Sequence, residues 1–291
     1  MLLLILNFLS LTFSPNDSLS LISTFGDFDD AISISASREE YIFIVDDNMN
    51  QVYKYSSSGV KLANIGGSGF GKNEFNMPQS VDATNGLDVY ICDYQNNRLQ
   101  RFDINLSYIA TFDFNLYDKT ADNSKKIYRP YGVAFQTTSD IFVLADATSY
   151  RVVKLKAFDE VSLLFGSRGF GYDILTSPKK VVKGSNLDIW ILDKGTDEII
   201  NFDSYGTIVK RMKNPEKHRL ISIAFYKDNL YMLNDQYVMI YDLNSGQYTQ
   251  SYSYNTEGDT NLTDITALNE NNILILTKGK VYLFQLTNSK N

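Results

Sequence analysis

Cysteine and histidine are nearly absent from this 291-residue sequence, which contains one of each. Cys92 therefore has no partner for an intrachain disulfide, and the chain cannot assemble the usual cysteine and histidine ligands of a zinc site. The single histidine, His218, stands in a polar stretch at residues 213–219. We expect it to be a solvated loop residue rather than the base of a catalytic triad.

Clusters of basic residues are also scarce. The chain has 27 lysines and arginines against 34 aspartates and glutamates, which gives a formal net charge of −7. Binding to a phosphate backbone needs clustered basic side chains, and only residues 210–219 offer such a group. The composition therefore predicts no nucleic-acid partner, and it favours cations or basic partners.

Long hydrophobic runs are missing beyond the first thirteen residues, which are mostly apolar. That run is too short to span a bilayer, but its length is typical of the apolar part of a secretory signal. We therefore expect residues 1–17 to be a signal or leader segment and the protein to be exported, either periplasmic or extracellular. We expect no membrane span.

The sequence does contain a repeated unit: a short apolar strand, usually ending in Asp, then a turn and a second strand. The six copies pair residues 42–46 with 52–55, 89–93 with 99–102, 141–146 with 152–155, 189–193 with 199–202, 230–234 with 238–241, and 273–277 with 281–284. The ends of the first strands are 47, 53, 47, 41 and 43 residues apart. Such a period is typical of propellers and solenoids.

Each unit expands into four strands. A further strand precedes the pair, beginning near Pro78, Pro130 and Pro178 in three copies, where proline removes no ladder hydrogen bond. The sixth unit lacks its outer strand, and residues 19–25 near the amino terminus read like the outer strand at 161–165. We therefore predict an all-β, six-bladed β-propeller of four-stranded antiparallel blades over residues 18–291, a single domain whose amino-terminal strand completes the last blade.

Residues 77–81 (MPQSV) and 89–102 (VYICDYQNNRLQRF) resemble the NHL repeat family of six-bladed β-propellers. Weaker likeness recurs at residues 130–133 (PYGV) and 165–171 (FGSRGFG). The resemblance covers roughly residues 19–286 and implies the propeller fold. It does not imply one activity, because such propellers include scaffolds, ligand binders and a few enzymes.

Two glycine-rich segments and one insertion interrupt the pattern. Residues 66–71 and 166–171 are spaced like phosphate-binding loops, but each precedes a strand rather than a helix. We therefore interpret both as inter-blade connections. Residues 114–128 lengthen the second interval, of 53 residues, and we expect them to extend a loop on the same face.

The candidate site residues end the second strand of each blade, near the end of the channel that lies on the face of the loops that join blades. They are Asp46, Asp93, Asp146, Asp193 and Asn234, with Arg98 and Arg151 five residues after their aspartates. One interpretation is structural: the carboxylates accept hydrogen bonds from the following turn and pair with the arginines. The other is a ligand site, where converging carboxylates attract a cation, calcium rather than zinc, or a basic partner.

These observations favour a non-catalytic binding or scaffold module, a monomeric domain that takes a protein, peptide or glycan through its loop-rich face and needs no cofactor. The alternative is an enzyme. The resemblance implies calcium-dependent lactonases or lyases with a channel metal, for which Asp93, Asp146, Asp193 and Asn234 are the available ligands. Nucleic-acid binding, which some members of the family show, is opposed by the acidic charge.

Overall fold

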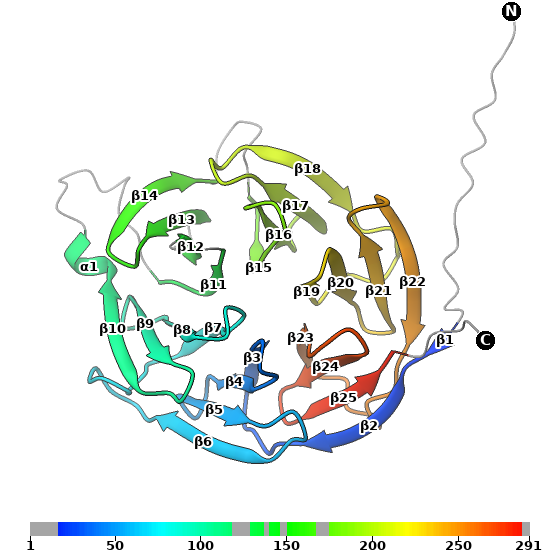
Figure 1. The fold of residues 1–291 in the computed structure, drawn as a ribbon, viewed down its shortest axis with the longest axis horizontal. Coiled ribbons are helices and arrows are strands. Elements are labelled where there is room, and N and C mark those ends of the chain that lie inside the picture. Colours follow the sequence, from blue (N-terminus) through cyan, green and yellow to red (C-terminus); the bar gives the residue numbers. More distant parts are fainter. Residues whose placement is uncertain (1–16, 118–128, 137–139, 146–149, 167–174, 287–291) are drawn as a thin grey trace, which may run out of the picture.

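The computed structural model describes residues 17–117, 129–136, 140–145, 150–166 and 175–286. Over these ranges the chain forms six β-sheets arranged as blades around a central channel (Figure 1). The predicted all-β, six-bladed propeller is confirmed. Within the same ranges, the structure contains no helix with the length and apolarity that a membrane crossing requires.

Five of the six blades contain four antiparallel strands, and blade five has a short additional strand. The strands of blade six come from both ends of the chain, whereas those of blades one to four come from one continuous stretch each. Blade one consists of β3 (Ala31–Ala36), β4 (Ile42–Asp46), β5 (Gln51–Tyr55) and β6 (Lys61–Gly66). Blade two consists of β7 (Pro78–Asp82), β8 (Asp88–Asp93), β9 (Arg98–Asp103) and β10 (Tyr108–Asp113). Blade three consists of β11 (Gly132–Phe135), β12 (Asp140–Ala145), β13 (Arg151–Lys156) and β14 (Glu160–Phe165).

The remaining blades follow the same order from the channel outward. Blade four consists of β15 (Pro178–Lys183), β16 (Ile189–Asp193), β17 (Glu198–Phe202) and β18 (Ile208–Lys213). Blade five consists of β19 (Ser222–Tyr226), β20 (Asn229–Leu233), β21 (Tyr237–Asp242), β22 (Gln247–Ser253) and the added β1 (Asp17–Ser18). Blade six consists of β23 (Leu262–Ala267), β24 (Asn272–Thr277), β25 (Val281–Gln285) and β2 (Ser20–Phe25).

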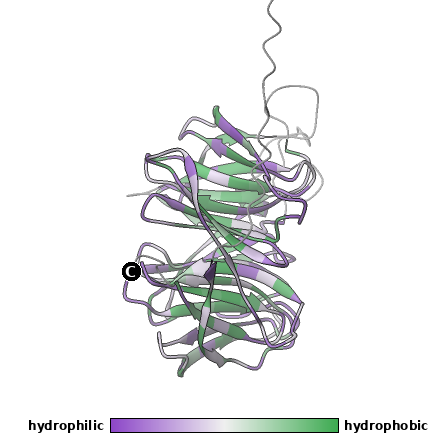
Figure 2. Cartoon of the chain, turned by 90° about the vertical axis from the view of Figure 1, so that its right-hand side faces the viewer, coloured by the Kyte–Doolittle hydropathy of each residue, from purple (hydrophilic) through white to green (hydrophobic). Residues whose placement is uncertain are grey.

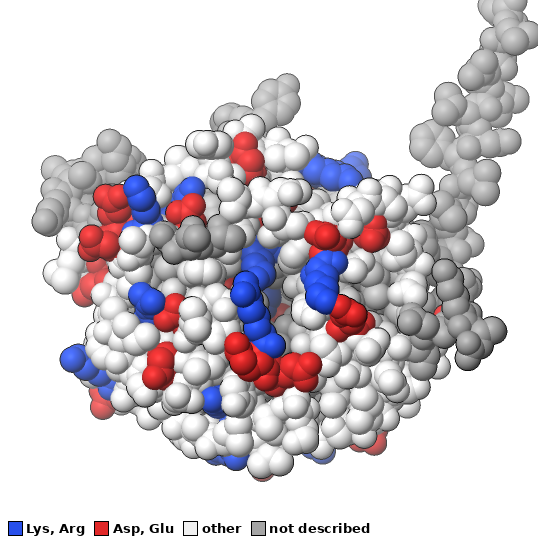
Figure 3. All heavy atoms as spheres, in the orientation of Figure 1, with Lys and Arg blue, Asp and Glu red and all other residues white. Residues whose placement is uncertain are grey.

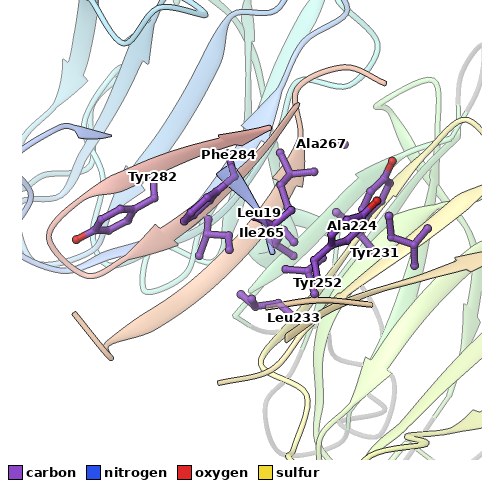
Figure 4. Close-up of a cluster of buried hydrophobic side chains, with 13 residues drawn as sticks. Leu19, Ala224, Tyr231, Leu233, Tyr252, Ile265, Ala267, Tyr282 and Phe284 are labelled. Carbon is purple, nitrogen blue, oxygen red and sulfur yellow. The ribbon is translucent and has the colours of Figure 1, made fainter. Parts of the chain in front are cut away.

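The two ends of the chain close the ring, as the sequence predicts. Strand β2 pairs antiparallel with β25, with Ser20 opposite Gln285 and Phe25 opposite Val281. The sequence did not predict β1, which adds two residues in parallel to the outer edge of blade five. Between β1 and β2, the buried Leu19 belongs to the apolar cluster shared by blades five and six (Figure 4). One short segment thus joins the edges of two neighbouring blades.

The second strand of each blade is buried on both faces because it lies between two neighbouring blades. All five residues of β4 are buried: Ile42 and Ile44 pack toward blade six, whereas Phe43 and Val45 pack toward blade two. Alternate residues of a strand point to opposite faces, so a strand between two apolar sheets is a continuous apolar run. Figure 2 shows this hydrophobic interior along the strands, with hydrophilic residues toward the loops.

Side chains in the channel wall link the innermost strands of neighbouring blades. The hydroxyl oxygen of Ser35 on β3 accepts the backbone N–H of Ala83 at 3.0 Å, just beyond β7. The carboxylate of Asp82 accepts the N–H of Phe135 on β11 at 2.6 Å. Buried polar groups of this kind are stable only when bonded, so each link both satisfies a polar atom and fixes one blade against the next.

The connections between blades agree with the sequence where they are described. The glycine-rich segment at residues 66–71 joins β6 to β7, and Gly66 and Gly67 have φ values of 130° and 121°. Of its counterpart at 166–171, only Gly166 lies within the described residues. The insertion begins with an unpredicted four-residue helix, α1 (Phe114–Tyr117), and its residues 118–128 lie outside the described ranges.

Truncation tests the ring closure. We expect a chain that begins at residue 17 to unfold in urea at the same midpoint as the full chain. A chain that begins at residue 26 loses β1, β2 and the buried Leu19, and exposes the edge of β25. Loss of the Leu19 burial alone costs about 2 kcal/mol, so its midpoint should be much lower. Equal midpoints for the two truncations would contradict this closure.

Candidate functional site

The aspartates that end the second strands are fully buried where the structure describes them. Asp46, Asp93 and Asp193 each have 0% exposure. Their carboxylates accept backbone N–H groups from the connection that leads into their own blade, at these distances: Asp29 to Asp46, 2.9 Å; Asn76 to Asp93, 2.8 Å; Thr176 and Ser177 to Asp193, 2.6 and 2.7 Å. Each carboxylate therefore fastens an inter-blade loop to the second strand.

The same positions also bind the turn that follows them. Asp46 accepts the N–H of Met49 at 3.1 Å, and Asp193 accepts that of Gly195 at 2.9 Å. Asn234 takes the equivalent place in blade five, where its side-chain oxygen accepts the N–H of Tyr237 at 2.6 Å. These contacts match the structural interpretation of the repeated Asp or Asn, an acceptor for N–H groups in a tight turn.

Asp93 has the largest set of partners. Its carboxylate is 2.7 Å from Nε of Arg98, the pairing that the five-residue spacing predicted, and it accepts Nδ2 of Asn96 at 2.9 Å. Burial raises the pKa of Asp93, while the hydrogen bonds and the Arg98 charge oppose that shift. Arg98 also donates to the carbonyls of Phe70, Gly71 and Glu74, at 2.8, 2.9 and 3.0 Å, and so holds the glycine-rich connection in place.

The predicted pair of Asp146 and Arg151 lies only partly within the described residues. Asp146 lies outside the described residues, so its pairing with Arg151, the first residue of β13, stays a prediction. Within the described ranges, no group of three or more histidine, cysteine, aspartate or glutamate side chains is arranged to hold a metal ion. Ligand binding by the blade-end aspartates, and calcium binding among them, likewise stay predictions.

The opposite end of the channel contains a hollow of about 470 Å³. It lies where the innermost strands end and turn into the second strands, and every blade contributes to its wall. We call it the channel mouth and define it by one residue from each blade: Arg38, Thr84, Gln136, Lys183, Phe225 and Thr266. Four of these, Thr84, Lys183, Phe225 and Thr266, also line the narrow channel below, so the two spaces are continuous.

Charged side chains gather around the channel mouth (Figure 3). Two of those that line it have partners: Lys227 bonds to Glu270, and Glu40 accepts Nδ2 of Asn269 at 3.0 Å. Lys183 is half-buried, and burial lowers its pKa, with the Arg38 charge acting in the same direction and Asp82 opposing it. Lys183 and Arg38 have no hydrogen bond or ion pair with any residue that the structure describes. The mouth thus holds two unpaired cations.

Sequence reasoning placed the candidate site at the other end of the channel and missed this one. A usable signal was present: basic residues stand at the end of the innermost strand or in its turn in three blades, at Arg38, Lys183 and Lys227. Their convergence could not be seen in the sequence because the three residues come from turns more than 40 residues apart in the chain.

A second hollow, of about 510 Å³, lies on the same face between blades two and three. In its wall, the rings of Tyr90 and Phe135 are stacked with centroids 5.6 Å apart. Arg101 donates to both carboxylate oxygens of Asp88, at 2.9 and 3.0 Å. The charges of Arg101 and Asp88 are therefore neutralised within the wall, whereas Arg38 lines this hollow as well as the channel mouth.

Substitution of Asp93 tests the structural role of the buried carboxylates. We expect Asp93→Ala to lower the free energy of unfolding by about 3 kcal/mol or more, because Arg98 would lose its partner in a buried site. Urea unfolding measures this, with Asp159→Ala as the control, since Asp159 is exposed in the β13–β14 turn. A change of less than about 1 kcal/mol in Asp93→Ala would contradict the role.

Comparison with known proteins agrees with this architecture. The NHL repeat model matches residues 75–102, which include β7, β8 and nearly all of β9. No curated protein matches the sequence. Among solved structures, virginiamycin B lyase from Staphylococcus aureus is similar with a TM-score of 0.64 and 12% identity, over 93% of this chain and 100% of that chain.

Two further solved structures are similar at the same level. A streptogramin B lyase has a TM-score of 0.60 and 13% identity over 93% of this chain and 88% of the other. A catalytically inactive histidine-to-alanine variant of the Staphylococcus aureus virginiamycin B lyase, with quinupristin, has a TM-score of 0.61 and 12% identity over 93% and 99%. Identities this low show the fold alone. The chain is therefore a six-bladed β-propeller that carries an NHL repeat in its second blade.

Proposed function

We propose that this chain is a non-catalytic binding module that takes a protein, peptide or glycan at the channel mouth. The observation that carries the proposal is the hollow of about 470 Å³ to which all six blades contribute. Its size and its mixture of apolar and polar walls are typical of ligand sites. Because the wall is built from strand ends of a closed ring, the site is rigid before a ligand arrives, which reduces the entropy lost on binding.

The remaining polar groups of the fold favour binding over chemistry. The described blade-end carboxylates are engaged by loop and turn N–H groups, and the channel-wall carboxylates of Asp82 and Asp264 hold backbone N–H groups of neighbouring blades. We further propose that the protein acts outside the cytoplasm. The mostly apolar run of the first thirteen residues, typical of a secretory signal, supports this location.

Filling the channel mouth tests the proposal. Ser185 is exposed and lines the hollow, so we expect Ser185→Tyr to fold normally and to block the ligand. The purified full chain, coupled to beads, should capture a reproducible partner from the source envelope fraction. The Ser185→Tyr protein should capture less than about a tenth as much, as expected for the loss of well-packed contacts at the centre of a site.

Ser245→Tyr is the matched control, because Ser245 is also exposed in a turn but does not line the hollow. It should capture as much as the unchanged chain. No reproducible partner for the unchanged chain, or equal capture by the Ser185→Tyr protein, would overturn the proposal.

A second candidate function is a lyase-like activity, and two observations favour it. The similar solved structures include streptogramin-type lyases, one of them inactivated by loss of a histidine. In this chain Nδ1 of His218 is 2.9 Å from the carboxylate of Asp235, a pairing that suits a general base. This pair lies in the inter-blade connection before β19 and the turn after β20, at the opposite end of the channel from the mouth.

Incubation with quinupristin, with and without added calcium, separates the two candidates. A binding module leaves quinupristin intact under both conditions, as measured by mass spectrometry of the reaction mixture. A lyase-like enzyme converts quinupristin to a product, and the His218→Ala protein does not. Turnover that is lost in His218→Ala would replace the binding proposal with the enzymatic one.

A further inference from the structure

The channel mouth contains two cations that no residue in the described part of the chain neutralises. Lys183 is the last residue of β15, and Arg38 lies in the turn between β3 and β4. Both line the hollow, and Lys183 also lines the channel beneath it. The carboxylate that acts on the pKa of Lys183 is that of Asp82, whose two oxygens accept the N–H groups of Thr84 at 2.7 Å and Phe135 at 2.6 Å. No ion pair forms between Asp82 and Lys183.

Two other partly buried lysines in this propeller have carboxylate partners. Lys180, also on β15 and in the channel, is 2.5 Å from Asp264, and Lys154 is 2.9 Å from Asp140. A half-buried charge without a partner lowers stability, because burial removes water from the ammonium group and nothing replaces it. Lys183 has no such partner among the described residues, and the hollow in front of it is where a compensating anion would enter.

The walls beside the two cations define what else a ligand presents. Arg38 offers a planar guanidinium group that bonds a carboxylate in two places, and Lys183 offers a point charge. Phe225 and Leu268 add apolar surface in the same hollow. Ser185 and Gln136 add hydrogen-bonding groups. This combination suits a carboxylate next to an apolar side chain and a backbone amide, which is the chemistry of a peptide's carboxyl terminus.

We propose that the channel mouth binds the carboxyl terminus of a peptide or protein, with the terminal carboxylate held by Lys183 and Arg38 and the last side chain packed on Phe225 and Leu268. The inference rests on the proposed function and names its ligand class. It also gives a reason for an unpaired, half-buried lysine in a protein whose net charge is −7. The charge that lowers stability in the free protein is the one that the ligand neutralises.

The test uses a pool of amino-terminally fluorescent tripeptides that end in Leu or Phe, made with a free carboxylate and with a carboxamide. Fluorescence anisotropy with the full chain should show binding of the free acids and at least about tenfold weaker binding of the amides, as expected for loss of charge-assisted hydrogen bonds. Lys183→Met and Arg38→Gln should each weaken the free acids by about tenfold. Lys156→Met removes an exposed lysine away from the hollow and should bind like the unchanged chain.

Urea unfolding of the Lys183→Met protein separates a binding role from a structural one. We expect its unfolding midpoint to equal or exceed that of the unchanged chain, because methionine removes an unpaired charge at similar volume. A lower midpoint would identify Lys183 as a structural residue and overturn the inference. Equal binding of acids and amides, or no binding of either, would also overturn it.

Two further outcomes distinguish this inference from the proposed function. If Ser185→Tyr abolishes partner capture while Lys183→Met and Arg38→Gln capture normally, the mouth is a binding site but the carboxylate inference is wrong. If free glucuronic acid blocks capture while the tripeptides neither bind nor compete, the ligand is an acidic sugar and the peptide inference is again wrong.

Discussion

The pairing of β2 with β25 is the contact on which the rest of the structure depends. It joins residues from the two ends of the sequence, with Ser20 opposite Gln285, and it completes the only blade that one continuous segment cannot build. Ring closure leaves each blade packed between two neighbours, so apolar second strands such as β4 are buried on both faces. It also brings the ends of six innermost strands around one hollow. The extra strand β1 and the buried Leu19 extend this closure to blade five.

The polar groups of the propeller divide into three sets with different roles. The buried blade-end carboxylates fasten loops and turns to the second strands at one end of the channel. Ser35, Asp82 and Asp264 link the innermost strands of neighbouring blades in the channel wall. Their side-chain oxygens accept backbone N–H groups that have no strand partner on that side. The third set consists of the unpaired cations at the channel mouth, Lys183 and Arg38. Because Lys183 and Arg38 have no partner among the described residues, their charges remain available to a ligand in the hollow.

Much of this fold could be predicted from the sequence because its determinants are local. Apolar runs such as Ile42–Asp46 predict a strand that is buried on both faces, and the Asp at the end of the run predicts a turn. The spacing of Asp93 and Arg98 on the two strands of one hairpin was enough to predict their ion pair. The missing outer strand of blade six followed from counting strands, since closed propellers leave few edges unpaired. The short strand β1 and helix α1 could not be predicted, because each is fixed by tertiary contacts rather than by a repeated pattern.

The candidate site could be predicted much less well, since it depends on which charges find partners far away in the chain. Lys180 and Lys183 lie on the same strand, yet only Lys180 forms an ion pair with a carboxylate, that of Asp264. Closure of the ring underlies the whole structure, and hydrogen–deuterium exchange of peptides covering residues 20–25 tests it most directly. We expect these amides to exchange as slowly as those of β25, because both strands belong to one cooperative sheet. Exchange as fast as in an unstructured peptide would contradict it.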